Sequence, residues 1–260
     1  MPEGDTIFRT ATTLRPHLEQ RVIQSASAQR DDLKPASLAA RTVASIEARG
    51  KHLLMHLDDG RAIHSHMGMT GSWHAYAHGE PWRKPPERAH LELRTDDAVI
   101  VCFTPKLLEL LTHNELRAHP WLARLGPDML ASEFDEKEAL RRFRVRNDLP
   151  IGEAVMNQTL VCGIGNIYKS EVLFITRVDP LVRVDKLSDD VLLLILRKAR
   201  SLMLSNRGTN RRRTRLRGDG GNHWAYGRAG EACYECGAAI VIRRQGDLGR
   251  TTYYCPQCQS

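Results

Sequence analysis

The sequence predicts an α+β chain of several parts: an N-terminal β-sandwich with a capping helix, a helical region and a C-terminal zinc ribbon. Three observations support this prediction. Short strand-like segments with regular turns fill most of the first 111 residues, helical candidates follow from Ser132, and two Cys-x-x-Cys pairs lie near the C-terminus. Regularly spaced short strands favour a sandwich or barrel, and close cysteine pairs favour a metal site.

The N-terminal elements are predicted from the period of their apolar residues. Apolar residues recur at helical spacing from Thr6 to about Gln20, and Pro16, inside this run, is expected to end or kink the helix. A longer loop with three prolines is expected before residue 90, and Lys106–Leu111 fits either a short strand or a short helix. The predicted strands are Val22–Gln29, Thr42–Ala48, Lys51–Leu57, Arg61–Met67, His90–Arg94 and Ala98–Phe103.

Composition changes near residue 120, where prolines and glycines indicate a linker. Helical patterns follow, and in the last of them Ser188 is placed as the N-cap, with Asp189 and Asp190 in the first turn, where a helix favours negative charge. The predicted helices are Ser132–Phe143, Ile151–Gln158, Asn166–Thr176 and Ser188–Asn206.

Length and charge limit the classes of protein to consider. At 260 residues the chain is long enough for one or two domains with a real core. No stretch approaches the ~20 apolar residues of a membrane span, and the absence of a signal sequence favours a cytoplasmic protein. The net charge is +7 with a pI near 9.3, and six arginines lie within Arg207–Arg217. A polyanionic partner is therefore worth considering, although the arginines also fit a solvated loop.

Four of the six cysteines indicate one structural zinc ion. Cys233 and Cys236 form one close pair, Cys255 and Cys258 form the other, and eighteen residues separate the pairs. This spacing is typical of a four-cysteine zinc site, whose closed tetrahedron has a structural rather than a catalytic role. The strand-like segments Val241–Arg244 and Thr251–Tyr254 between the pairs predict a hairpin. The other two cysteines, Cys102 and Cys162, are predicted to be buried thiols.

A glycine-rich turn opens the third predicted helix, at Cys162-Gly163-Ile164-Gly165-Asn166. Backbone N–H groups and the positive end of the helix dipole at such a turn favour an anion. No strand or dinucleotide fingerprint precedes it, so a phosphate of a nucleic-acid backbone fits better than a nucleotide cofactor. Asn166 also occupies the position of an N-cap.

The first residues carry a possible covalent chemistry. If Met1 is removed, the chain begins at Pro2, whose secondary amine has Glu3 beside it. An α-amino group titrates near pH ~7.7–8.0, against ~10.4 for lysine, so more of it is uncharged at neutral pH. Attack of this amine on the anomeric carbon of a sugar would give an iminium, and the carboxyl group could move protons. By itself, a proline after the initiator is commonplace and fits a harmless start before a helix.

Five motifs together resemble one family. They are Met1-Pro2-Glu3-Gly4, Arg49-Gly50-Lys51-His52-Leu53, Gly163-Ile164-Gly165-Asn166-Ile167-Tyr168, Tyr226-Gly227-Arg228-Ala229-Gly230 and the cysteine ribbon. Their order closely resembles the formamidopyrimidine-DNA glycosylase/endonuclease VIII family from Pro2 to Gln259. The resemblance implies an N-terminal β-sandwich (1–120), a linker (121–131), a helix–two-turns–helix domain (132–222) and a zinc finger (223–260).

The resemblance also implies an activity and the residues that carry it. The expected function is a bifunctional DNA glycosylase/AP lyase of base excision repair, with Pro2 as the Schiff-base nucleophile, Glu3 as the proton donor and acceptor, and β,δ-elimination. Lys51, Asn166 and Arg250 would hold phosphates around the lesion, and such contacts position the protein rather than read the sequence. The damaged base must leave the stack, so an apolar side chain must fill the gap. Met69 matches this role, with core packing as the alternative.

Departures from the family pattern favour the endonuclease VIII branch. Members of the oxidised-guanine branch usually have glutamate where this chain has Thr6, and they carry an Arg-x-Phe loop that the region near Thr104–Leu108 lacks. Ser65-His66 and the Pro-Glu-Gly-Asp-Thr start resemble the endonuclease VIII branch, especially its actinobacterial members. Oxidised pyrimidines and tolerance of single-stranded DNA are therefore expected. The alternatives are an oxidised-purine glycosylase and a non-catalytic module that binds damaged DNA.

The remaining expectations concern partners and ordinary side chains. The resemblance implies a bacterial, nucleoid-associated protein that acts as a monomer on damaged double-stranded or single-stranded DNA, with no membrane and no nucleotide cofactor. His64 and His66 lie on one face of a predicted strand and could suit a metal, but packing or exposure to solvent is the simpler interpretation. Glu171 is expected to be a solvated or capping residue.

Overall fold

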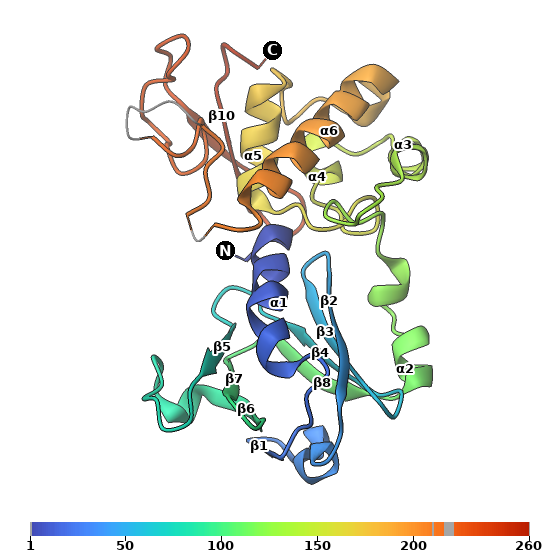
Figure 1. The fold of residues 1–260 in the computed structure, drawn as a ribbon. Coiled ribbons are helices and arrows are strands. Elements are labelled where there is room, and N and C mark those ends of the chain that lie inside the picture. Colours follow the sequence, from blue (N-terminus) through green and yellow to red (C-terminus); the bar gives the residue numbers. More distant parts are fainter. Residues whose placement is uncertain (1, 210, 216–220, 260) are drawn as a thin grey trace. The chain divides into compact units, whose positions relative to one another are not determined.

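The computed structural model describes residues 2–209, 211–215 and 221–259, and the chain forms two compact units, Met1–Arg124 and Leu125–Ser260 (Figure 1). The predicted linker 121–131 spans the division between them. The finer division of the second unit into a helical domain (132–222) and a zinc finger (223–260) stays a prediction. Within the described residues, no helix is long and apolar enough to cross a membrane.

The first unit is a sandwich of two antiparallel four-stranded sheets, as predicted. One sheet has the order β1-β6-β7-β5 and the other the order β2-β3-β4-β8. The strands are β1 (Ser25–Ala28), β2 (Val43–Arg49), β3 (His52–Leu57), β4 (Ala62–His66), β5 (Ser72–Tyr76), β6 (Ala89–Arg94), β7 (Val99–Phe103) and β8 (Leu107–Leu111). The undecided segment Lys106–Leu111 is thus a strand. β5 lies where only a loop was expected, although the alternation in Ser72-Trp73-His74-Ala75-Tyr76 is typical of a strand.

Helix α1 (Gly4–Leu18) packs against this sandwich and contributes Ile7, Ala11, Leu14 and Leu18 to its core. Pro16 was expected to end or kink the helix; it does not end it, because the helix continues for two residues beyond it. Pro16 removes only its own N–H group, and Glu19 N–H still donates to Arg15 O (2.9 Å) to close the last turn.

Apolar residues from both sheets fill the space between them. Leu53, Met55 and Ile63 of one sheet share a core with Leu91 and Ile100 of the other. β7 is buried along its whole length, because Val99, Val101 and Phe103 pack on its other face with Tyr76 and Trp82. Cys102 belongs to the core, where burial raises the pKa of its thiol, and Cys162 of the second unit is also buried. Both cysteines were predicted to be buried.

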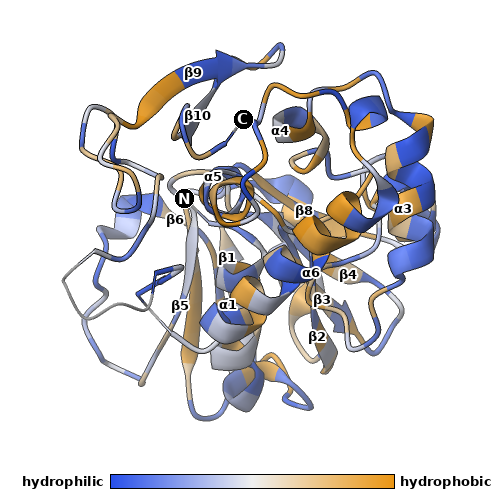
Figure 2. Ribbon diagram, turned by 90° about the horizontal axis from the view of Figure 1, so that it is seen from above, coloured by the Kyte–Doolittle hydropathy of each residue, from blue (hydrophilic) through white to orange (hydrophobic). Residues whose placement is uncertain are grey.

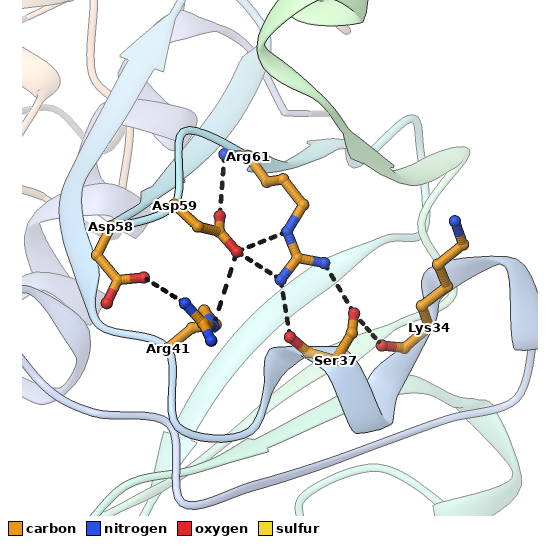
Figure 3. Close-up of polar contacts among 6 residues, drawn as sticks. All are labelled: Lys34, Ser37, Arg41, Asp58, Asp59 and Arg61. Atoms are coloured by element: carbon orange, nitrogen blue, oxygen red, sulfur yellow. Dashed lines mark hydrogen bonds and ion pairs between the residues drawn. The ribbon is translucent and has the colours of Figure 1, made fainter.

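A polar cluster fixes the β3–β4 turn, Asp58-Asp59-Gly60 (Figure 3). The Arg61 guanidinium donates to Asp59 (2.8 Å) and to Ser37 Oγ and O (both 2.7 Å), and Arg41 lies near both aspartates. Ser37 belongs to the 3₁₀ helix η2 (Pro35–Leu38), which follows η1 (Asp31–Leu33). The cluster therefore ties η2 to the end of β3 that lies opposite Lys51. The remaining short helices of this unit are η3 (Pro86–Arg88), α2 (His113–Arg117) and η4 (Leu122–Arg124).

The second unit is built around α5 (Asn166–Ile175) and α6 (Asp189–Asn206). The other elements are α3 (Glu136–Val145), α4 (Ile151–Ala154), η5 (Val184–Lys186), β9 (Val241–Gln245) and β10 (Arg250–Tyr254). α6 buries the side of the helix that carries Leu192, Ile195 and Leu196, and its hydrophobic and hydrophilic stretches are distinct in Figure 2. Ser188 caps it as predicted, accepting from Val191 N–H (3.3 Å).

Two helix boundaries differ from the prediction. α3 begins after Asp135, whose carboxylate accepts from Glu138 N–H (2.9 Å), rather than at Ser132. α4 ends at Ala154 instead of continuing to Gln158, because the Gln158 side chain bonds the following turn, donating to Ile164 O (3.1 Å) and accepting from Gly163 N–H (3.1 Å). α4, these turns and α5 together give the helix–two-turns–helix arrangement that the resemblance implied.

Histidines occupy the outer face of the β2-β3-β4-β8 sheet. The register pairs His52 with His66 and His64 with Glu109, whereas Leu53 and Ile63 on the alternate positions enter the core. Burial lowers the pKa of His52 to about 3 and that of His66 to about 4, with the charges of Lys51 and Lys106 adding to the effect. These rings are therefore neutral in the folded protein well below pH 6.

Stability is accordingly expected to fall as the pH is lowered from 6.5 to 5. The folded-state pKa values lie below the unfolded value of ~6.5, so the unfolded chain takes up protons in this range and the folded chain does not. His52 alone would contribute a loss of about 2 kcal/mol at pH 5. Urea unfolding at pH 7.5 and 5.0 measures this loss. His52→Gln and His66→Gln should each reduce it, while the exposed His113→Gln serves as the control. Equal losses in all three variants would contradict the assignment.

Candidate functional site

Pro2 and Glu3 immediately precede the first turn of α1. Glu3 is the N-cap and is fully buried, and Pro2 is half-buried. The backbone of the turn is closed by Thr6: its N–H donates to Glu3 O (2.9 Å), and its Oγ1 accepts from Glu3 N–H (3.4 Å). Thr6, the residue that differs from the usual glutamate of the oxidised-guanine branch, thus fixes the backbone of Glu3. The start of α1 thus places the buried carboxyl group of Glu3 directly beside Pro2.

Lys51 lies in the two-residue turn between β2 and β3. Arg49 pairs with His52 across this turn, and Gly50 has a φ of +56°, which favours glycine. The Arg-Gly-Lys sequence therefore places a lysine at the tip of a tight hairpin. Lys51 itself is half-buried.

Met69 lies in an exposed loop, and its side chain is 71% exposed, so the alternative of core packing is wrong. Gly71 N–H donates to Met67 O (2.9 Å), and a Cβ at Gly71 would lie only 2.4 Å from that oxygen and 2.9 Å from Pro105 Cα. The loop is therefore closed tightly enough to require glycine. The loop therefore holds Met69 at the surface, where its side chain is accessible to a partner.

The segment next to this loop is short. β7 and β8 are joined by Thr104, Pro105 and Lys106 alone, and Thr104 Oγ1 donates to Thr70 O (3.3 Å). Lys106 N–H donates to His66 O (2.9 Å). The structure therefore has no extended loop in the region where an Arg-x-Phe motif was sought, and the connection supports the Met69 loop instead.

In the second unit, Asn166 differs from its prediction as an N-cap. The N-cap is Gly165, and Asn166 is the first helical residue. Its side chain is directed away from the helix, where Nδ2 donates to Thr251 Oγ1 (3.1 Å) on β10. Among the described residues, its buried Oδ1 has no hydrogen-bond partner. An unsatisfied buried amide oxygen is costly, and a bound donor or water would satisfy it.

Arg250 is the first residue of β10, and its side chain is exposed. It follows Gly249 in the tip of the β9–β10 hairpin and adjoins Thr251, the partner of Asn166. Within the described residues, its guanidinium forms no ion pair. Asn166 and Arg250 are two of the predicted phosphate contacts. They are connected through Thr251, which bonds Asn166 and directly follows Arg250 in β10.

A buried lysine, not singled out from the sequence, strengthens this connection. Lys169 is 1% exposed, and its ammonium donates to Thr251 O (3.0 Å) and Thr252 Oγ1 (2.7 Å). Tyr253 N–H donates to Ser170 Oγ (3.3 Å). Asn166, Lys169 and Ser170 are spaced i, i+3, i+4, so they form one polar helical face against β10. That spacing was visible in the sequence as polar residues within an otherwise apolar helix.

Glu171, expected to be solvated or capping, is fully buried, so that expectation is wrong. Its carboxylate accepts from the N–H groups of Trp224 (2.7 Å), Ala225 (2.8 Å) and Tyr226 (2.8 Å), and from Thr214 Oγ1. Three successive backbone donors form an anion-binding concavity that satisfies the buried charge. The carboxylate thereby anchors the chain that leads into the cysteine ribbon.

The arginine-rich segment is not uniformly a solvated loop. Arg215 is buried, with its guanidinium 3.9 Å from the Tyr234 ring and 5.0 Å from the Trp224 ring. Arg212 lies 4.9 Å from the Tyr168 ring. These are cation–π distances. Residues 210 and 216–220, among them Arg217, lie outside the described residues.

The four cysteines converge. The Sγ atoms of Cys233, Cys236, Cys255 and Cys258 all lie within 4.8 Å of one another. Cys236 Sγ is 3.4 Å from Cys255 Sγ, and Cys233 Sγ is 3.8 Å from Cys258 Sγ. Zn–S bonds of ~2.3 Å in a tetrahedron give S···S edges of about 3.8 Å. The donor set and its spacing fit one zinc ion.

The predicted residues thus fall into two groups. The first unit holds Pro2, Glu3, Lys51 and Met69, and the second holds Asn166, Arg250 and the cysteine cluster. Each group sits on turns and strand ends that are held by hydrogen bonds within its own unit. The sequence missed the buried polar residues beneath these positions.

Comparison with known proteins gives the family. The family model of the formamidopyrimidine-DNA glycosylase N-terminal domain matches residues 1–106, and that of its H2TH domain matches residues 125–213. A probable endonuclease 8 2 of Streptomyces coelicolor is 37% identical over 100% of this chain and 94% of its own length. The DNA-(apurinic or apyrimidinic site) lyase Nei2 of Mycolicibacterium smegmatis is 33% identical over 100% and 99%.

A formamidopyrimidine-DNA glycosylase of Edwardsiella ictaluri is 30% identical over the whole of both chains. The structure of Lactococcus lactis formamidopyrimidine-DNA glycosylase, non-covalently bound to DNA with an AP site, has the same fold, with a TM-score of 0.83, 24% identity and 99% coverage of both chains. Sequence identity to the two actinobacterial proteins, 37% and 33%, is higher than the 30% identity to the Edwardsiella ictaluri glycosylase. The chain belongs to the formamidopyrimidine-DNA glycosylase/endonuclease VIII family, and its similarities agree with the endonuclease VIII branch.

Proposed function

We propose that this chain is a bifunctional DNA glycosylase/AP lyase of base excision repair that removes oxidised bases, pyrimidines preferentially. Family membership and the names of the relatives support the reaction class. The observation that carries the proposal is the N-terminal turn, in which the buried Glu3 adjoins Pro2 at the start of α1. The proposed site of action is the bacterial cytoplasm, on DNA of the nucleoid.

The reaction would begin once Met1 has been removed. The Pro2 amine attacks the anomeric carbon of the damaged nucleotide, and the glycosidic bond breaks as a proton transferred by Glu3 assists the departing base. Transfer of the proton from the Pro2 nitrogen to the ring oxygen then breaks the bond between that oxygen and the anomeric carbon, and the iminium of the opened sugar acidifies the neighbouring carbon. Loss of a proton there expels the 3′ phosphate, and a second elimination expels the 5′ phosphate. Water then releases Pro2, so neither a nucleotide cofactor nor a catalytic metal takes part.

Four further side chains would hold the DNA. Lys51, Asn166 and Arg250 would contact phosphates beside the lesion, through an ammonium at a hairpin tip, an amide N–H group at the start of α5 and an exposed guanidinium. Met69 would enter the stack where the damaged base has left, since it is large, apolar and exposed on a tightly closed loop. The protein would act as a monomer on double-stranded or single-stranded DNA.

The preference for pyrimidines rests on two features of the first unit. Thr6 replaces the glutamate usual in the oxidised-guanine branch, and the three residues that join β7 to β8 do not contain the Arg-x-Phe motif of that branch. An oxidised-purine glycosylase is the alternative within the family. A panel of duplexes with one oxidised pyrimidine or one oxidised guanine separates the two by relative rates of excision.

One structural zinc ion would be held by Cys233, Cys236, Cys255 and Cys258. When bound, zinc closes a tetrahedron of thiolates and stabilises a segment too small to fold by itself. Its effect on DNA would be indirect, through the β9–β10 hairpin that carries Arg250. The segment also depends on Glu171, which anchors the chain entering it.

Borohydride trapping tests the nucleophile. The mature protein should give a covalent adduct on duplexes with an oxidised pyrimidine and with an abasic site, and the DNA-bearing peptide should begin at Pro2. Glu3→Gln should lose trapping on the damaged base but keep it at the abasic site, where no base remains to depart. The same protein with an uncleaved N-terminal extension is the matched control and should give no adduct. An adduct on a lysine, or none with mature protein, would reject the mechanism.

Salt dependence tests the phosphate contacts. Lys51→Met and Arg250→Met should each weaken binding to an abasic duplex and reduce the slope of log K against log[salt] by about 1, because each variant releases one counterion fewer. Arg141→Met, which removes an exposed arginine of α3 that is paired with Glu138, is the control and should leave the slope unchanged. Slopes equal to that of the wild type in both variants would exclude the two contacts.

Metal analysis tests the cysteine cluster. The wild-type protein should contain one zinc ion per chain, and Cys236→Ser should lose it, because three thiolates leave the tetrahedron open. Loss of the zinc ion should also weaken binding to abasic DNA, because the β9–β10 hairpin that carries Arg250 is no longer supported. Cys102→Ala, a change in the sandwich core, should keep the zinc. Full zinc content in Cys236→Ser would disprove the assignment of ligands.

A further inference from the structure

The outer face of the β2-β3-β4-β8 sheet carries four polar side chains that the proposed reaction does not use. His64 is fully buried, His52 and His119 are each 7% exposed, and Glu109 is partly exposed. They come from three adjacent strands, β3, β4 and β8 (Figure 1), and from the segment after α2. Such a row is unusual on an outer face, because buried polar groups are costly unless every one is satisfied.

The four side chains form one continuous hydrogen-bonded row, called here the histidine chain. His119 Nε2 is 2.8 Å from Glu109 Oε1, and His64 Nδ1 is 2.7 Å from the same oxygen. The other nitrogen of His64, Nε2, is 2.8 Å from His52 Nδ1. The chain therefore crosses the sheet from the end of the first unit to the first residue of β3.

The backbone around His119 sets every proton position in the chain. His119 Nδ1 faces the N–H groups of Leu122 (3.3 Å) and Trp121 (3.4 Å), so it must accept, and its proton is on Nε2. Glu109 Oε1, as an acceptor, then receives N–H groups from His119 and from His64. Burial lowers the pKa of His64, so its ring is neutral and has one proton, on Nδ1; His64 Nε2 therefore accepts, and His52 donates from Nδ1. One set of neutral tautomers satisfies all these contacts.

These proton positions also exclude a metal site at the same residues. His64, Glu109 and His119 have ligand atoms within 4.8 Å of one another and could form a metal site. To bind a metal, His119 Nε2 would need a lone pair, yet Nδ1 already uses a lone pair to accept the backbone N–H groups. Both ring nitrogens would then lack a proton, whereas a neutral imidazole carries one. The two contacts of 2.7 and 2.8 Å at one oxygen are also hydrogen-bond distances. The cluster is a hydrogen-bonded chain.

His52 connects the chain to Lys51. It directly follows Lys51, and its backbone pairs with Arg49 to close the two-residue turn. Anchoring the His52 ring to Glu109 through His64 therefore fixes the residue next to the lysine. The chain also keeps His52 neutral beside a cation, in agreement with its lowered pKa. A charged or freely rotating ring at this position would displace the turn.

We propose that the histidine chain positions Lys51 for the DNA phosphate, with Glu109 as the positioning residue that fixes the tautomers of His64 and His52. This inference rests on the proposed function. Glu109 acts through Lys51, so its removal should cost binding only while Lys51 is present. A purely structural role would instead add its cost to that of any Lys51 variant.

A double-mutant cycle on mature, zinc-loaded protein tests this. Glu109→Met removes the shared acceptor and should weaken binding to an abasic duplex about tenfold, with the lower salt slope of Lys51→Met. Lys51→Met/Glu109→Met should bind no more weakly than Lys51→Met. Glu109→Gln keeps an oxygen that accepts both N–H groups and should bind within about twofold of the wild type. The rate of the lyase step on fully bound DNA should likewise fall in Glu109→Met, fall no further in the double variant than in Lys51→Met, and stay near that of the wild type in Glu109→Gln.

The outcomes separate the two proposals. If Lys51→Met changes neither affinity nor slope, the proposed phosphate contact itself fails. If Lys51→Met has its effect but Glu109→Met adds its full cost in the double variant, or Glu109→Gln is as impaired as Glu109→Met, the positioning role is overturned. His119→Phe, which breaks the other end of the chain, repeats the cycle if Glu109→Met is unfolded by circular dichroism. Additive losses there would likewise overturn the role.

Discussion

The second unit depends on the burial of charge along one helix. α5 carries the ammonium of Lys169 and the carboxylate of Glu171 into the interior, where both form hydrogen bonds with protein groups. Lys169 holds β10, and Glu171 holds the chain that enters the cysteine ribbon. Breaking either set would leave a buried charge without partners, which is strongly destabilising. The hairpin that carries Arg250 is therefore fixed to α5 by polar contacts as much as by the cysteine cluster.

The sequence predicted what depends on local periodicity and on cysteine spacing. The sandwich, α6 with its Ser188 cap and the convergence of four cysteines follow from patterns a few residues long. The boundary of α4 could not be predicted, because it depends on the Gln158 side chain bonding a turn that exists only in the folded chain. Asn166 was placed one position early for a similar reason: its amide binds Thr251, which is 85 residues away.

The buried polar rows were less predictable still. His64 and His66 were noticed as a pair, but the residues that determine the role of His64, Glu109 and His119, lie on another strand and beyond α2. The alternation of β4 places His64 and His66 on the face opposite Ile63, but it does not show that another segment covers that face. On the sequence alone, a histidine on the outer face of a sheet is an ordinary solvated residue. Register and the covering segment change that interpretation.

The connection between β7 and β8 has a consequence for how this architecture can diversify. Loops generally tolerate insertion, since the entropic cost of closure grows slowly with length. Here Pro105 lies against Gly71, and Thr104 bonds to Thr70, so the connection also forms one wall of the loop that presents Met69. A lengthened connection would shift the Met69 loop as well. The connection and Met69, the residue proposed to fill the vacated stack, would therefore change together during evolution, as one module rather than as two independent traits.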